Sequence, residues 1–182
     1  LEPGDDRGTG GIQQSGDPVI IPLSAKTTEQ LRQIAIDLLD FIRADAKLPL
    51  RRPEVLDLGR LGYTLQTGRE AMEERLGFIV SSVVQLAGKL QSYIDGTQNI
   101  DGVRQGRAKR RNDASALLIA DGGLQETIDQ WMRDKRLSKL LELWVQGVEL
   151  DWGKFYGGAE PRRMRLPVYP FAKERYWADS KA

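Results

Sequence analysis

The 182-residue sequence contains no histidine and no cysteine. Without histidine, a Ser-His-Asp relay and a histidine general base are excluded. Without cysteine, the chain by itself has no thiolate nucleophile, disulfide, iron–sulfur cluster or Cys/His zinc site. No phosphate-binding glycine loop and no Gly-x-Ser-x-Gly elbow is present either. These absences favour a protein that is not an enzyme and needs no cofactor; catalysis by carboxylates or lysine is the alternative.

An excess of charge of one sign is also missing. The chain has 27 Lys and Arg residues against 26 Asp and Glu residues, a formal net charge of +1, so long-range steering of nucleic acid is not implied. No apolar run approaches the roughly 20 residues that cross a bilayer, and no signal-peptide core opens the sequence. We expect a cytoplasmic protein without a membrane span and without a nucleic-acid partner.

The first 18 residues are rich in glycine and contain two prolines but no aromatic residue. Such a segment cannot bury enough apolar area to offset its ordering entropy, so it is predicted to be a disordered linker. Leu1 stands where a complete chain would begin with methionine, and a fragment of a larger protein is therefore expected.

Hydrophobic spacing from residue 19 onward predicts alternating strands and helices. Short apolar runs predict strands at residues 19–24, 74–82 and 116–120. Apolar residues three and four apart predict helices at residues 28–42, 55–66 and 83–94, the first capped by Thr27 and the last ended by Asp95-Gly96. Residues 124–147 are predicted to form two helices or one bent helix.

This alternation predicts an α/β fold, with a small sheet of about three strands and helices packed on it, followed by a helical hairpin and an extended C-terminal strap. We divide the chain into four parts: a disordered linker at 1–18, an α/β subdomain at 19–120, a helical insertion at 121–152 and the strap at 153–182.

Residues 102–112 form a basic segment that is expected to be a loop. It holds five cations within eight residues and no acid, namely Arg104, Arg107, Lys109, Arg110 and Arg111. Binding to nucleic-acid phosphates is one interpretation, but the segment has no aromatic residue for stacking. A solvated loop or a contact for an acidic protein partner is favoured. The adjacent acids Glu73 and Glu74 are expected on the solvated surface.

Aromatic residues suggest interfaces at two places. Trp131 and Trp144 occupy apolar helical positions, where core packing and a protein interface are both open. Within the strap, residues 161–177 mix prolines and aromatic residues and show neither helical nor strand periodicity. A sequence this apolar at the end of a chain is expected to cover another surface.

Four motifs resemble the regions that flank the ketosynthase in modular polyketide synthases. RRMRLPVYPFAKERYW at 162–177 resembles the RR-x-x-LPTYPF-x-x-x-RYW strap, with Val168 where threonine is usual. LWVQGVELDW at 143–152 resembles the WV-x-G-x-x-VDW stretch that precedes that strap. PLSAK at 22–26 resembles the start of the linker that leaves a ketosynthase, and YTLQTGREAM at 63–72 resembles its YTLQ-x-GREAM signature. The four occur in the family's order.

A departure from the usual pattern refines this resemblance. The usual synthase inserts a whole acyltransferase between the linker and the strap, whereas about fifty residues separate Ile94 from Trp144 here. The gap resembles synthases whose acyltransferase is a separate protein that acts in trans. The resemblance implies a non-catalytic flanking subdomain, sometimes called an acyltransferase docking domain, whose partner is a ketosynthase outside this chain.

Two scaffolding roles follow from the resemblance, and both stay open. In the first, the helical insertion joins neighbouring subdomains as a weak homo-oligomer, through Leu124, Ile128, Trp131, Met132, Arg133, Leu137 and Leu140. In the second, the basic segment Arg104, Arg107, Lys109, Arg110 and Arg111 docks a free-standing acyltransferase.

The strap is expected to pack on the ketosynthase in either case, through Leu166, Pro167, Tyr169, Pro170, Phe171, Arg175, Tyr176 and Trp177. In this chain alone, the strap is therefore expected to fray or to pack on a neighbour.

Overall fold

The computed structural model of the chain describes residues 16–46, 56–68, 70–108, 123–164 and 166. Three strands form one antiparallel sheet in the order β1-β2-β3, namely β1 (Val19–Ala25), β2 (Glu74–Val80) and β3 (Val103–Arg107). Ile21 of β1 lies opposite Phe78 of β2, and Glu74 of β2 lies opposite Arg107 of β3. The central strand is thus β2.

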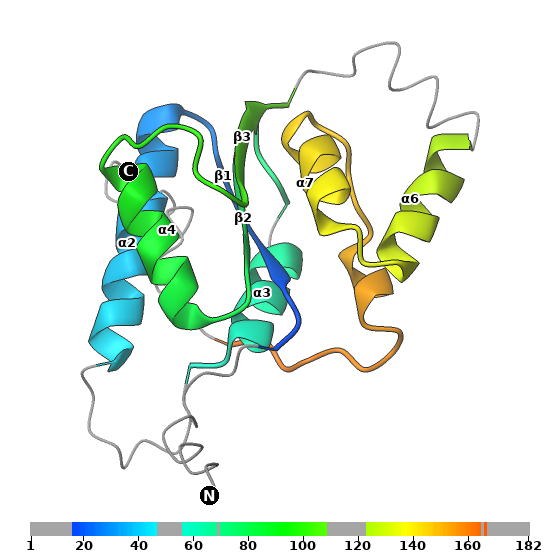
Figure 1. Cartoon of the computed structure of the whole chain (residues 1–182), viewed down its shortest axis with the longest axis horizontal. Helices are drawn as coiled ribbons and strands as arrows, with labels where there is room; N and C mark the ends of the chain where they lie inside the picture. Colours follow the sequence, from blue (N-terminus) through cyan, green and yellow to red (C-terminus); the bar gives the residue numbers. More distant parts are fainter. Residues whose placement is uncertain (1–15, 47–55, 69, 109–122, 165, 167–182) are drawn as a thin grey trace, which may run out of the picture.

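Helices cover both faces of this sheet, which gives three layers (Figure 1). On one face lie α2 (Thr28–Ala46) and α4 (Val83–Ile94), and on the other lie α6 (Gly123–Arg133) and α7 (Leu137–Val145). Helix α3 (Leu58–Thr67) packs against β1. The 3-10 helix η1 (Trp152–Phe155) packs against α3 and α6. The predicted α/β fold with a small sheet and a helical hairpin is confirmed.

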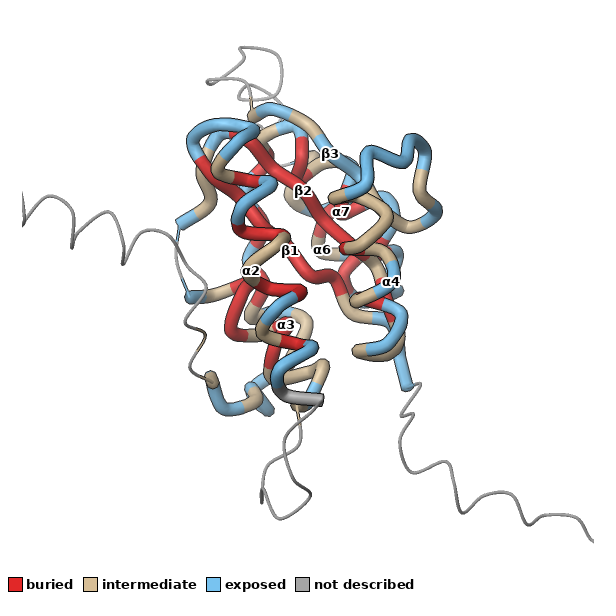
Figure 2. The backbone as a smooth tube through the Cα atoms, turned by 90° about the vertical axis from the view of Figure 1, so that its left-hand side faces the viewer, coloured by how far each residue is buried: buried red, intermediate tan, exposed pale blue. Residues whose placement is uncertain are grey.

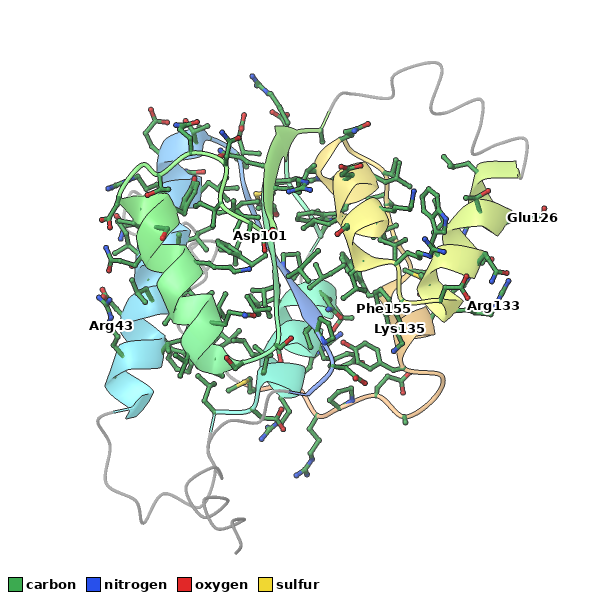
Figure 3. The ribbon with its side chains drawn as sticks, in the orientation of Figure 1. Arg43, Asp101, Glu126, Arg133, Lys135 and Phe155 are labelled. Carbon is green, nitrogen blue, oxygen red and sulfur yellow. The ribbon has the colours of Figure 1, made fainter. Side chains whose placement is uncertain are left out.

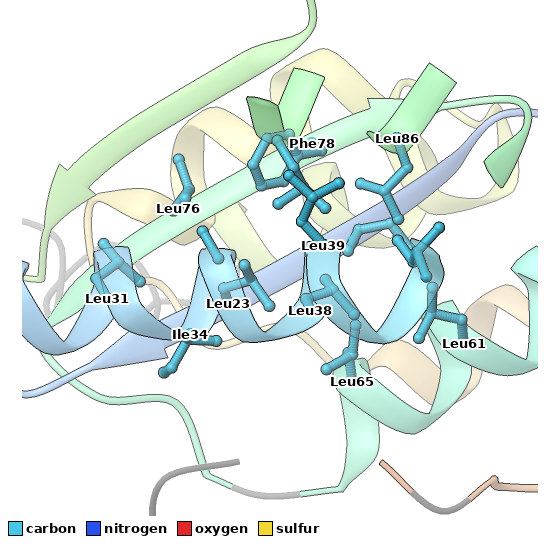
Figure 4. Packing of buried hydrophobic residues seen from close by; sticks show 14 of the residues in the cluster. Leu23, Leu31, Ile34, Leu38, Leu39, Leu61, Leu65, Leu76, Phe78 and Leu86 are labelled. Carbon is cyan, nitrogen blue, oxygen red and sulfur yellow. The ribbon is translucent and has the colours of Figure 1, made fainter. Parts of the chain in front are cut away.

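Two hydrophobic clusters lie on opposite faces of the sheet because side chains alternate along a strand. Ile21 and Leu23 of β1 point into the first cluster with α2, α3 and α4 (Figure 4). Ile20 points into the second cluster, which α6, α7 and η1 complete. Strands β1 and β2 are consequently buried along most of their length, whereas β3 is exposed or only partly buried (Figure 2).

Local capping explains where three helices begin or end. The hydroxyl of Thr27 accepts a hydrogen bond of 3.1 Å from the backbone N–H of Gln30, which confirms the predicted cap of α2. Asp57 caps α3 by accepting from the N–H of Gly59 at 2.8 Å, so α3 begins at Leu58 rather than at residue 55. Gly96, with φ 87°, follows the end of α4 as predicted.

The third strand lies where the sequence predicted a loop. β3 is formed by the first half of the basic segment, whereas the predicted strand at 116–120 falls outside the described residues. The VRQGR sequence has no alternating apolar pattern, and backbone pairing with β2 stabilises it instead. Glu74, expected on the surface, is buried opposite Arg107, because β3 covers it.

Candidate interaction surfaces

A tight turn joins α6 to α7 and makes them a hairpin. The backbone N–H of Arg136 donates to the carbonyl of Trp131 at 2.8 Å, and that of Lys135 donates to Met132 at 3.3 Å. With Lys135 at φ 56°, this is the Schellman pattern that ends helices. The ammonium of Lys135 lies 6.0 Å from the centre of the Phe155 ring, so the turn rests against η1 (Figure 3).

The inner face of the hairpin belongs to the chain's own core. Four of the seven residues predicted as lateral contacts are buried in the second cluster, namely Ile128, Met132, Leu137 and Leu140. They are therefore not available to a neighbouring molecule in this fold. Trp144 is buried beside them, which agrees with the core-packing interpretation. Leu124 and Trp131 are only partly buried and Arg133 is exposed, so these three remain candidates for contact.

The outer face of α6 carries side chains of both charges. Glu126 and Arg133 are exposed on this helix (Figure 3). The guanidinium of Arg133 donates to Gln130 at 2.8 Å, and the amide of Gln130 donates to Asp134 at 3.0 Å. Lys139 of α7 lies 5.4 Å from the centre of the Trp131 ring. The hairpin thus presents one partly buried indole beside a polar face of mixed charge.

A polar contact fixes the hairpin to η1. Lys154 donates to the carboxylate of Asp129 at 2.8 Å, and Gln125 donates to the same oxygen at 2.9 Å. The hydrogen bond from Lys154, followed by that from Gln125, holds the pKa of Asp129 below its usual value. The outer face of α6 therefore keeps one orientation relative to the layer beneath it.

The described part of the basic segment is already neutralised by acids of this chain. Arg104 lies 3.7 Å from the carboxylate of Glu142 on α7. Arg107 lies 3.5 Å from Glu73 and 3.3 Å from Glu74. The other three predicted contact residues, Lys109, Arg110 and Arg111, lie outside the described residues.

The beginning of the strap packs on α3 of the same chain. Arg60 donates to the carbonyls of Arg162 and Arg163 at 3.1 and 3.2 Å. The N–H of Met164 donates to the Thr64 hydroxyl at 2.9 Å. Met164 and Leu166 pack against the first hydrophobic cluster.

Leu166 thus packs on its own subdomain, whereas the strap in this chain alone was expected to fray or to pack on a neighbour; its contact with a ketosynthase stays a prediction. The physical reason is that the Arg60 guanidinium and the Thr64 hydroxyl satisfy the extended backbone. The other predicted strap residues lie outside the described residues, namely Pro167, Tyr169, Pro170, Phe171, Arg175, Tyr176 and Trp177.

Two buried polar residues that the sequence analysis did not single out hold the layers together. The guanidinium of Arg75, with a side chain 4% exposed, donates to the carbonyls of Met72 and Trp144 and to the carboxylate of Glu149, at 2.8 to 2.9 Å. It also stacks 5.0 Å from the centre of the Trp144 ring. Its position inside an apolar strand, ERLGFIV, was the available signal.

Gln66 is the second of these residues. Its side-chain NH2 donates to the carbonyl of Ile20 at 2.9 Å, which satisfies a backbone oxygen on the unpaired edge of β1. Its side-chain oxygen accepts a hydrogen bond from the Tyr156 hydroxyl at 2.6 Å. Burial raises the pKa of Tyr156 to about 12. This relay ties the segment after η1 to α3 and to the sheet. Its signal was the glutamine in the YTLQ motif.

The described residues contain no group of three or more His, Cys, Asp or Glu placed to hold a metal ion. Within the same residues, every helix is too short or too polar to span a bilayer.

Comparison with known proteins decides the family. Residues 22–97 match the family model described as RhiE-like, KS-MAT linker domain. Residues 22–97 of the chain therefore form a domain of this linker family. Polyketide synthases PksL and PksM of Bacillus subtilis (strain 168) are 42% and 45% identical to this linker over 165 residues. Each match covers 91% of the linker chain but only 4% of the synthase.

Solved structures agree with this assignment. The ketosynthase from module 6 of the bacillaene synthase from Bacillus subtilis 168 superposes on the linker chain with a TM-score of 0.74 at 34% identity, covering 87% of this chain and 26% of that one. The ketosynthase from module 1 of the bacillaene synthase from Bacillus amyloliquefaciens FZB42 gives 0.70 at 36% identity, with 86% and 26% covered. The resemblance to the ketosynthase-flanking subdomain of trans-acyltransferase polyketide synthases is confirmed.

Proposed function

We propose that this linker is a non-catalytic scaffolding subdomain beside the ketosynthase of a bacterial trans-acyltransferase polyketide synthase in the cytoplasm. We further propose that the outer face of its α6–α7 hairpin joins neighbouring ketosynthases laterally, through contacts between two copies. The family description as a linker and the match to ketosynthase structures support the first part. The chain spans about 4% of the length of the synthases PksL and PksM. Its place in a synthase of that kind, and its partners there, are therefore proposed.

The self-complementary charge on α6 is the observation that carries the lateral contact. Glu126 and Arg133 are both exposed and lie seven positions apart on this helix, which is close to two turns. Two copies of α6 that pair antiparallel about a twofold axis would bring Glu126 of each against Arg133 of the other.

Charge exchange tests this pairing directly. Sedimentation velocity over a wide concentration range would compare the wild type with Glu126→Arg, Arg133→Glu and the double variant. Each single reversal places like charges opposite one another and should weaken self-association, whereas the double exchange should restore it. Asp101→Arg, an equal charge change at an exposed turn before β3, is the matched control and should behave as the wild type.

Two results would contradict the lateral role. One is a monomer at every concentration, and the other is a double variant that associates as weakly as the two single variants. Circular dichroism of each variant would establish that it is folded. Trp131→Ala is a suitable further variant, whereas substitution of Leu137 would disturb the buried core of the hairpin.

The alternative role is a docking platform for a free-standing acyltransferase. The family description names a KS-MAT linker domain, and this mention of an acyltransferase beside the ketosynthase supports that role as the second candidate. The basic segment would supply the contact. Arg107→Glu combined with Arg110→Glu should then weaken binding of the acyltransferase to this chain, most strongly at low salt. Unchanged affinity at low salt would remove the segment as the contact.

A further inference from the structure

A cavity of about 200 Å³ lies where the sheet, the end of α3 and the segment that joins α7 to η1 meet. Trp144 and Trp152 line it, together with Glu70 and Glu149. Sites for organic cofactors and drug-sized ligands occupy roughly 300–1,000 Å³. The smaller volume suits a single long side chain that a partner protein inserts.

The lining favours a positive charge. Glu70 and Glu149 supply two carboxylates. The last turn of α3, represented by Leu65 and Gln66, also borders the cavity. Helix C-termini carry a partial negative charge that attracts cations. Trp144 already stacks with Arg75, and Trp152, in edge-to-face contact with Trp144 at 6.1 Å between ring centres, adds a second indole of the kind on which cations bind well.

The cation next to this cavity does not neutralise it. Arg75 is buried and its guanidinium is committed to two carbonyls and to Glu149. Within the described part of the chain, Glu70 is exposed and makes no ion pair. Counting Glu70, Glu149 and Arg75 leaves one uncompensated negative charge at the cavity.

We propose that this cavity receives the guanidinium of an arginine side chain from a partner protein. Arginine fits better than lysine because its flat guanidinium stacks on indoles and forms paired hydrogen bonds with carboxylates. Arginine is also among the residues that dominate binding energy at protein interfaces. The proposal rests on the proposed docking role but not on the lateral contact, since the cavity involves neither Glu126 nor Arg133.

An NMR titration of the whole chain with N-acetyl-arginine amide tests the site. We expect saturable shifts of the Trp144 and Trp152 indole signals and of the Ala71 amide. The uncharged citrulline analogue should cause none of them. Glu70→Gln should weaken binding about tenfold, the equivalent of about 1.4 kcal/mol. Glu126→Gln, an exposed carboxylate outside the cavity, should leave the affinity unchanged.

Three outcomes would overturn the proposal. They are shifts that do not saturate by about 50 mM ligand, equal shifts with citrulline, and equal affinity for N-acetyl-lysine amide. Resonances remote from the cavity would show that Glu70→Gln is folded. The Arg107→Glu/Arg110→Glu variant changes no residue that lines the cavity, so failure of the docking role appears in acyltransferase binding and failure of the arginine site appears in the NMR titration.

Discussion

Replacement of Arg75 by alanine should weaken the joint between the sheet and the α6–α7 layer. The Arg75 side chain is 4% exposed. Its guanidinium donates hydrogen bonds to Met72 in the loop before β2, to Trp144 at the end of α7 and to Glu149. No other residue described above connects these three places. Removing the guanidinium leaves two carbonyls without their charged donor.

The magnitude follows from these contacts. Hydrogen bonds to charged groups contribute about 1.5–3 kcal/mol each, and a desolvated cation–π contact such as that with Trp144 contributes up to about 2 kcal/mol. The released desolvation cost of the arginine offsets part of this loss. Glu149, whose side chain is 70% exposed, regains water and adds little. We expect a net loss of about 2–4 kcal/mol in the free energy of unfolding.

Urea denaturation measures this loss as a shift of the midpoint, about 1–2 M for a typical dependence of about 2 kcal/mol per M. Arg104→Ala is the matched control. The Arg104 guanidinium lies 3.7 Å from the Glu142 carboxylate, and the two side chains are 43% and 55% exposed. That variant should lose less than about 1 kcal/mol. If Arg75→Ala lost no more than Arg104→Ala, the assigned role of Arg75 as a joint would be wrong.

Three further perturbations test other contacts. Gly77→Ala places a Cβ against the side chain of Leu141, so it should cost about 1–3 kcal/mol in the free energy of unfolding. Gly77→Ala combined with Leu141→Ala should lower the free energy of unfolding by less than the sum of the losses in the two single variants, and urea denaturation of all three variants would measure this. Tyr156 keeps its proton in the folded chain up to a pKa of about 12, above its ordinary 10.0, so stability should fall as pH rises from 10 toward 12. Tyr156→Phe should make the fall in urea midpoint over that range smaller, and an unchanged fall would contradict the assignment. Arg163→Ala removes the hydrogen bonds to Thr67 and should speed hydrogen exchange at the Met164 amide roughly fivefold, since about 1 kcal/mol of local stability is lost. An unaltered exchange rate would show that Arg163 does not hold the strap.

Local and periodic features of the fold could be predicted from the sequence. Helix α2 begins after Thr27 and α4 ends before Gly96, because these signals act within one turn of the chain. The strand at residues 74–80 could be predicted from its apolar run alone. The ordered family motifs identified a ketosynthase-flanking linker, and the comparisons confirmed it.

Interaction surfaces were harder to predict, because the same residue type serves both a core and an interface. Leu137 and Leu140 have the spacing of an exposed apolar stripe, yet the second face of the sheet buries them. Trp131, on the same hairpin, stays partly exposed. Helical periodicity gives the side of the helix, but it does not say what covers that side.

The sequence by itself determined the elements with strong apolar period, their caps and the family. Only the tertiary structure decided that Val103–Arg107 is a strand, that Arg75 and Gln66 join layers, and that Arg60 holds the strap. Each of these depends on a partner between 25 and 103 positions away in sequence, such as Phe78 for Val103 or Arg163 for Arg60. A contact of that kind exists only once the chain has folded, so no local pattern encodes it.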